Sequence, residues 1–249
     1  MLRAVGSAEN ILTPEAAAAH QARSAAARLA APLQCLRQWW PDFGLAAEPV
    51  VERFASAFAS EERLIARAVD RRRNEFRAGR AAARAALAQI GCAPAAILAH
   101  PQRDPIWPAG FLGSITHSDS HALALAAPSR LIDAVGVDLE DDSALDASLT
   151  ASVCRPDERP AHAQFAGLGI DHAKLCFVAK EAVFKAIFPR QRSALQFQQL
   201  RLRFHIRDRS FRVEIRGAAT QVLSQLPGSG RFVCDPGVLM AAFVIRRRA

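Results

Sequence analysis

The sequence predicts an α+β chain built from two similar halves, each with one main helix and a small antiparallel sheet. Residues 61–90 and 171–188 carry apolar side chains at helical spacing. After residue 199 the chain instead alternates apolar and polar residues with a period of two, which is typical of strands. The order along the chain is helix, hairpin, helix and meander, so each half has a main helix followed by antiparallel strands. We therefore expect an N-terminal half over residues 1–133 and a C-terminal half over residues 134–249.

The first half begins with an alanine-rich leader over residues 1–40, for which the composition predicts a weak helix or poor order. A long amphipathic helix is expected over residues 61–90, and Gly91 should end it. The segments FLGSITHSDSHALALAAP, residues 111–128, and LIDAVGVDLE, residues 131–140, flank the short turn PSR. Together they predict a β-hairpin.

The second half contains a helix that should run from about Asp171 to Phe188 and end at Pro189, because proline interrupts the helical hydrogen bonds. Next come LRLRFHIRD and FRVEIRG, in which apolar and polar residues alternate. VLMAAFVI then predicts a more fully buried strand. These three segments should form the antiparallel meander of this half.

The composition bounds the function classes. With 249 residues, 51% of them apolar, the chain buries a sizeable core. The net charge of +8 indicates a polyanionic partner, which leaves open nucleic acid, an acidic membrane surface, a phosphorylated ligand or an acidic protein. Five widely spaced cysteines without a CxxC pair predict reduced thiols and a cytoplasmic location. We expect no export signal and no stable membrane association, because no run approaches about 20 apolar residues.

Three carboxylates suggest a metal site. Asp138 and Glu140 are two residues apart at the end of a predicted strand, so their side chains share a face. Two neighbouring carboxylates repel unless a cation or proton separates them, and Mg²⁺ prefers such oxygen ligands. A strand that simply reaches solvent explains the pair equally well. Glu181 on the second helix would add a third ligand, although Glu181 and Lys185 also fit an ordinary surface pair. Burial of this helix is indicated by Phe177, Phe184 and Phe188.

Basic residues offer phosphate contacts. Arg72 and Arg80 lie on one side of the first helix, where they would form a phosphate clamp, a solvated basic face or part of a nucleic-acid surface. The segment GSITHSDSH places His117, Asp119 and His121 on one strand face, which is an alternative transition-metal site. His117 also fits hydrogen bonding to a phosphate, together with two hydroxyl residues that follow a glycine, Ser114 and Thr116.

Four blocks carry a resemblance: RRRNEFRAGRAAARAAL, RDPIWPAGFLGSITHSD, VGVDLE and FVAKEAVFKAIFP. Their order and spacing resemble the large, monomeric, pseudo-dimeric class of 4′-phosphopantetheinyl transferases, in the branch of the enterobactin-synthase component. The blocks cover roughly residues 71–189. The resemblance implies two halves in a pseudo-two-fold arrangement with the active site between them. It also implies transfer of phosphopantetheine from coenzyme A to a serine of an apo acyl or peptidyl carrier protein, which leaves 3′,5′-ADP, by a monomeric enzyme that binds no nucleic acid.

The resemblance also implies roles for the candidate residues. Asp138, Glu140 and Glu181 would hold Mg²⁺, or Mn²⁺, on the pyrophosphate, and Glu181 would accept the serine proton. The predicted contacts with coenzyme A come from Arg72, Arg80, Arg103, Ser114, Thr116, His117, Lys180 and Lys185. Among these, the two lysines would stabilise charge that develops on the pyrophosphate. In the same family pattern, Arg103 is the basic residue before the Trp-Pro pair.

Three other classes use parts of the same pattern. A Mg²⁺-dependent phosphohydrolase would need the three carboxylates but no protein acceptor. A nucleic-acid-binding module would need its arginines on one exposed face. A non-catalytic interaction protein would tolerate loss of all three carboxylates.

Overall fold

The computed structural model describes residues 14–51, 56–159, 162–166, 169–192, 195–215 and 228–247. The helices are α1 (Pro14–Trp39), α2 (Ala59–Leu64), α3 (Asp70–Gln89), α4 (Ala147–Val153), α5 (His162–Ala166) and α6 (His172–Gln191), with a 3₁₀ turn η2 (Phe197–Gln199). The strands are β1 (Gly44–Pro49), β2 (Leu98–Ala99), β3 (Pro105–Ile106), β4 (Phe111–His117), β5 (His121–Pro128), β6 (Ile132–Glu140), β7 (Leu200–His205), β8 (Ser210–Ile215), β9 (Gly228–Asp235) and β10 (Val238–Arg246).

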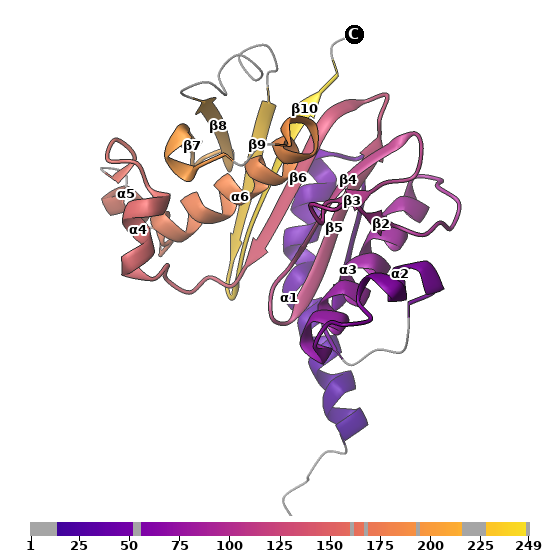
Figure 1. Cartoon of the computed structure of the whole chain (residues 1–249). Helices are drawn as coiled ribbons and strands as arrows, with labels where there is room; N and C mark the ends of the chain where they lie inside the picture. Colours follow the sequence, from indigo (N-terminus) through magenta and orange to yellow (C-terminus); the bar gives the residue numbers. More distant parts are fainter. Residues whose placement is uncertain are drawn as a thin grey trace, which may run out of the picture.

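Two larger antiparallel sheets confirm the α+β class and the plan of one main helix per sheet, and β2 and β3 form a separate two-stranded sheet (Figure 1). The first sheet has the order β1-β5-β4, and α3 packs on β1 and β5. The second has the order β6-β10-β9-β8-β7, and α6 packs on β6 and β10. The two sheets meet where β4 lies against β6. Residues from the two halves therefore adjoin along this line.

Each main helix approaches its sheet at a glycine. A Cβ added at Gly44 of β1 would lie 1.8 Å from the carbonyl oxygen of Ala86 in α3. A Cβ at Gly136 of β6 would lie 1.9 Å from the carbonyl oxygen of Ala182 in α6. Only glycine permits such contact between a strand and a helix backbone. In the second half, this contact sets the distance between the carboxylates of β6 and the charged side chains of α6.

The leader contributes a structural helix. Leu29, Leu33 and Leu36 of α1 are buried in a core that also contains residues of β5, β6 and β10. This core joins the two sheets, and separate apolar clusters lie beneath α3 and α6. The C-terminal part of α1 is therefore ordered by apolar burial that its alanine-rich sequence did not reveal. In the described part of the chain, no helix has the length and apolar character that a membrane span requires.

The helix expected over residues 61–90 is two helices. The chain leaves the helical path between α2 and α3, and two ion pairs hold α2 against α3. Arg84 contacts Glu61 at 2.7 Å, and Arg77 contacts Glu62 at 2.8 Å. The helical spacing was continuous, but these contacts between distant residues favour the break. Gly91, with φ of 79°, follows the end of α3 as expected.

The expected hairpin around PSR is wrong. β5 turns back on β4 at residues 118–120, whereas β6 crosses to the second sheet and pairs with β10. The apolar pattern could not distinguish a neighbouring partner from one about a hundred residues away. Pro189 also fails to end the second helix, which continues to Gln191. Proline in the last turn removes one helical hydrogen bond, and Arg192 then ends the helix in the left-handed conformation.

Candidate functional site

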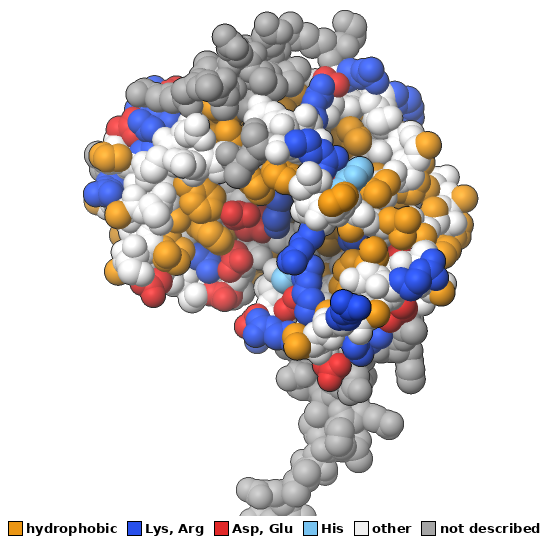
Figure 2. Space-filling view, in the orientation of Figure 1, with side chains coloured by type: hydrophobic (Ala, Val, Ile, Leu, Met, Phe, Trp, Pro, Cys, Tyr) orange, Lys and Arg blue, Asp and Glu red, His pale blue; other side chains and the backbone are white. Residues whose placement is uncertain are grey.

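A pocket of about 320 Å³ lies between the two halves. Figure 2 shows acidic and basic side chains gathered around a hollow in this part of the surface. One wall comes from α3 and β4, and the other comes from β6 and α6. The lining residues are Arg72, Glu75, Phe76, Gly79, Arg80, Arg103, Pro105, Ile115, Thr116, His117, Asp138, Glu140, Phe177, Glu181 and Lys185. Most of the residues singled out by sequence are therefore brought together.

The acidic wall contains the three predicted carboxylates, and two of them contact lysines. Lys185 Nζ lies 2.6 Å from Asp138 Oδ1, which also accepts a 2.8 Å hydrogen bond from Thr116 Oγ1. Lys174 Nζ lies 3.0 Å from Glu140 Oε2. Glu181 is on α6, one turn before Lys185. Asp138 and Glu140 are thus each paired with a lysine, and Glu181 lies near the charges of Asp138, Lys185 and Glu140.

The donor set of this wall fits a divalent cation. Asp138 Oδ2 is buried and has no hydrogen-bond partner. Burial, followed by the charges of Asp138 and Glu140, raises the pKa of Glu181. A bound cation would remove this repulsion. Among the described residues, however, no group of three His, Cys, Asp or Glu side chains already converges on one point. For a metal to bind, Lys174 and Lys185 would have to move away from Glu140 and Asp138. The side chains of the alternative transition-metal site, His117, Asp119 and His121, likewise do not form such a group.

The basic wall is organised around Glu75 of α3. Arg72 Nη1 lies 3.2 Å from Glu75 Oε2 and 3.1 Å from His117 Nε2. His117 Nε2 is 3.7 Å from the same Glu75 oxygen. Burial lowers the pKa of His117, while the charge of Glu75 opposes this shift. Glu75 therefore orients an arginine and a histidine toward a common space from adjoining elements.

Arg80 is a second cation of the basic wall, and it is held rigidly. Its side chain stacks on Phe76, with 4.4 Å from the guanidinium carbon to the ring centre, and it donates a 3.2 Å hydrogen bond to the carbonyl of Leu98. Its Nε is buried without a partner. Burial lowers the pKa of Arg80 to about 10, partly offset by the charge of Glu61. A buried arginine with an unused donor, beside a pocket, suits an anionic ligand.

The structure corrects the role expected for Lys180. Its side chain is fully buried and lies outside the pocket, because α6 turns it toward the segment after α4. Lys180 Nζ contacts Glu158 Oε2 at 2.7 Å and donates to the carbonyls of Val153 and Phe197. Lys180 directly precedes Glu181 on α6, so its side chain points away from the pocket that Glu181 lines. Lys180 is therefore part of the core of the second half.

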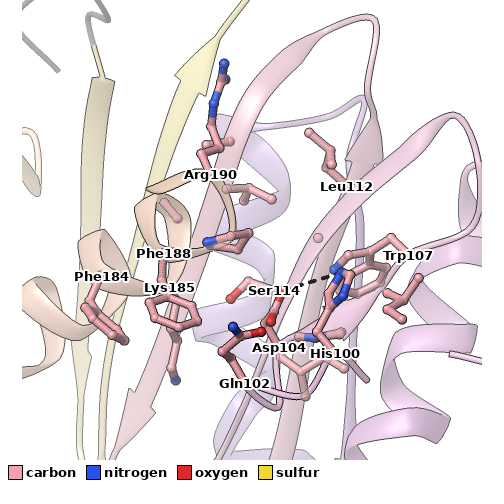
Figure 3. A pocket seen from close by; sticks show the side chains of 18 of the residues that line it. His100, Gln102, Asp104, Trp107, Leu112, Ser114, Phe184, Lys185, Phe188 and Arg190 are labelled. Atoms are coloured by element: carbon pink, nitrogen blue, oxygen red, sulfur yellow. Dashed lines mark ion pairs between the residues drawn. The ribbon is translucent and has the colours of Figure 1, made fainter. Parts of the chain in front are cut away.

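A second cavity, of about 580 Å³, adjoins the first and shares Arg103, Pro105, Ile115 and Lys185 with it. Figure 3 shows Phe184 and Phe188 of α6 on one side, with Trp107 and His100 on the other. Ser114 lines this second cavity and not the first; its hydroxyl accepts a 3.1 Å hydrogen bond from the backbone of Val137. The contact predicted for Ser114 therefore does not fit the charged pocket.

Sequence reasoning missed two charged residues of the site, although each had a signal. Glu75 lies three and four residues after two arginines, within the first block of the resemblance, and it pairs with both Arg71 and Arg72. Lys174 belongs to the small set of lysines in this chain, which all lie on α6. Its partner Glu140 was already a candidate ligand. The available clues were thus the spacing of Glu75 from two arginines and the rarity of lysine in this chain.

Comparisons with known proteins identify the family of this chain. A model of the 4′-phosphopantetheinyl transferase N-terminal domain matches residues 60–127, and a model of the 4′-phosphopantetheinyl transferase superfamily matches residues 134–230. The chain also aligns with the solved ACPS–CoA complex of Chronobacterium ammoniagenes, with a TM-score of 0.37 and 19% identity. That alignment covers 46% of this chain and 98% of the other.

Named relatives align with large parts of the chain. It is 37% identical over 155 residues to the 4′-phosphopantetheinyl transferase Npt of Nocardia iowensis, which covers 62% of this chain and 69% of that protein. Identity to PptT of Mycobacterium tuberculosis is 31% over 191 residues, or 74% and 84% of the two chains. Enterobactin synthase component D of Escherichia coli O157:H7 matches at 36% over 47% of this chain and 55% of its own length. The chain is a transferase that belongs to the 4′-phosphopantetheinyl transferase family.

Proposed function

We propose that this transferase moves the 4′-phosphopantetheine group of coenzyme A to a serine of an apo acyl or peptidyl carrier protein, with Mg²⁺ and with release of 3′,5′-ADP. The observation that carries the proposal is the pocket between the halves, which has three carboxylates on one wall and basic side chains on the other. Phosphoryl transfer depends on positioning and charge neutralisation, which such a pocket supplies.

The basic wall would bind the donor. Arg72 and Arg80 would contact the 3′-phosphate, and His117 would contact a phosphate nearer the carboxylates. Arg103 lies at the border of both cavities, with its backbone in the left-handed conformation at φ of 73°. This position supports a contact with coenzyme A. Glu75 would keep Arg72 and His117 oriented before the donor arrives.

The acidic wall would carry the chemistry. Asp138, Glu140 and Glu181 would hold Mg²⁺, with Mn²⁺ as a substitute; when bound, the ion supplies Lewis-acid stabilisation of the pyrophosphate. Lys185 would then contact the pyrophosphate and neutralise its developing charge. Glu181 would accept the proton of the carrier serine, directly or through a water.

We also propose how the chain is divided, where the protein acts and which partner it does not bind. We divide the chain into halves at residue 133, because β6 begins the second sheet close to this point. A cytoplasmic monomer is proposed, and the five free cysteines suit a reducing compartment. Nucleic acid is a less suitable partner, since Arg77 and Arg84 of α3 are paired with Glu62 and Glu61 and so are not free for a phosphate backbone.

The decisive experiment is a transfer assay. The protein is incubated with coenzyme A, Mg²⁺ and an apo carrier protein, and the carrier mass is then measured. The expected result is a phosphopantetheine adduct on one serine together with 3′,5′-ADP. Cleavage of coenzyme A at the same rate without any carrier would instead indicate a phosphohydrolase. A salt-sensitive complex with generic DNA or RNA, without adduct formation, would favour the nucleic-acid alternative.

The arginine clamp leads to a quantitative prediction. Replacing Arg72 or Arg80 with alanine should weaken coenzyme A binding by roughly 1.5–3 kcal/mol, the scale of a lost charge-assisted hydrogen bond. Calorimetric titration measures this change, and Arg73→Ala is a matched control because Arg73 lies on the same helix, contacts Ala66 and Asp70, and does not line the pocket. Dephospho-coenzyme A should show a smaller penalty. Equal penalties for both compounds would assign the arginines to another part of the donor.

Salt should act on the encounter with the carrier more than on chemistry. Carrier domains of this class are expected to be acidic, and the chain has a net charge of +8. Raising salt from about 0.05 to 0.5 M shortens the Debye length from roughly 14 to 4 Å. We expect kcat/KM for the carrier to fall steeply while kcat at saturating carrier changes little. A flat kcat/KM, measured with saturating coenzyme A, would mean that docking is chiefly apolar.

A further inference from the structure

The chain uses lysine at only three positions. Lys174, Lys180 and Lys185 are its lysines, and every other one of its 32 basic residues is arginine. All three lie on α6, and each contacts a carboxylate through its ammonium group. An ammonium is a compact charge with rotatable donors, whereas the planar guanidinium of arginine holds a carboxylate through two parallel bonds. At the two lysines that contact carboxylates of the pocket, Lys174 and Lys185, a less persistent ion pair is therefore possible.

Lys174 is placed against the local preference of the helix. It lies in the first turn of α6, where the helix dipole disfavours a positive charge, and the capping carboxylate of Asp171 accepts a hydrogen bond from its backbone N–H. Its ammonium nevertheless folds toward the pocket wall, 3.0 Å from Glu140 Oε2 and 4.0 Å from Asp141 Oδ1. The Lys174 side chain is 10% exposed, against 29% for Glu140. The pair is thus anchored on the lysine side and open to the pocket on the glutamate side.

We propose that Lys174 is a positioning residue that acts as a resident counter-ion for Glu140 and withdraws from this carboxylate when the metal binds. The inference rests on the proposed Mg²⁺ site. Without metal, Lys174 and Lys185 neutralise Glu140 and Asp138, which keeps two of the carboxylates close together despite their repulsion. With metal, Glu140 exchanges one cation for another. Lys174 would then set how tightly the metal is held.

A purely structural role makes the opposite prediction. If Lys174 only fixed the side chain of Glu140, its loss would loosen a ligand and weaken metal binding. If Lys174 competes with the metal, its loss removes both a competitor and a nearby positive charge, so metal binding becomes tighter. The sign of the change in affinity therefore separates the two roles.

The affinity experiment uses the full chain and Mn²⁺, whose free concentration is read by electron paramagnetic resonance. Lys174→Met should tighten Mn²⁺ binding about tenfold, the scale of a screened interaction between a single and a double charge. Lys174→Arg should bind Mn²⁺ more weakly than the wild type, because the guanidinium fork holds Glu140 more persistently. Weaker binding in Lys174→Met, or equal affinities in all three proteins, would overturn the proposal.

The small number of lysines allows a direct spectroscopic test. With ¹³C-labelled lysine, the Cε–Hε signals of the three lysines are assigned from single variants, and Mg²⁺ is then titrated into the wild type. We expect the Lys174 and Lys185 signals to shift and the buried Lys180 signal to stay in place as an internal control. A shift of Lys185 without Lys174 would overturn this inference and leave the metal site standing. No shift at all, together with no Mn²⁺ binding, would overturn the metal site as well.

Discussion

Asp138→Asn should reduce phosphopantetheine transfer by about a thousandfold or more and leave the protein folded. The substitution preserves shape but removes the charge that Lys185 now neutralises at 2.6 Å and that the metal would require. Loss of a metal ligand removes several kcal/mol of transition-state stabilisation, and each 1.36 kcal/mol is a factor of ten in rate. Turnover is measured from the carrier adduct, and folding is checked by thermal unfolding. Glu140→Gln should give the same result.

Asp142→Asn is the matched control for this experiment. Asp142 follows the same strand, but its carboxylate accepts a hydrogen bond from the backbone of Gly237 and does not line the pocket. This variant should keep most of the wild-type turnover. If Asp138→Asn also kept near-wild-type turnover at saturating Mg²⁺, the assignment of Asp138 as a metal ligand would be wrong.

Lys180→Met should destabilise the fold by about 3–5 kcal/mol, because it leaves a buried carboxylate without its cation. Lys180 is 0% exposed and the Glu158 side chain only 2%. Glu158 also accepts hydrogen bonds from the backbones of Arg155 and Leu202, so it fixes the segment after α4 to β7. Urea unfolding measures the change. This loss would be a large part of the total stability of an ordinary domain.

A double variant tests the physical cause. Lys180→Met combined with Glu158→Gln should be more stable than Lys180→Met alone, since the amide keeps an acceptor but no longer buries an unpaired charge. The fraction of Lys180→Met that folds should retain turnover, because Lys180 lies outside the pocket. A Lys180→Met protein with normal stability but no turnover would support the sequence-based role on the pyrophosphate instead.

Much of the fold was predictable because it depends on local patterns. Helical spacing located α3 and α6, and alternation located β7 and β8. Two of the longer strands were missed: β1, a short alanine-containing segment, and β9, which begins in a glycine-rich stretch. Both owe their conformation to pairing with β5, β8 and β10. Strand partners depend on residues far apart in the chain, and a single sequence contains no direct record of them.

The sequence by itself determined the chemical inventory of the site, because Asp138 and Glu140 must share a face of any strand that contains them. It also placed Glu181 and Lys185 one helical turn apart. Only the tertiary structure decided which charges enter the pocket. The helix α6 has apolar residues on most of its surface, so its packing against β6 at Gly136 determines which side faces the cleft. That packing turned Lys180 into the core and brought Lys174 to Glu140, since burial of a helix face is a property of its neighbours.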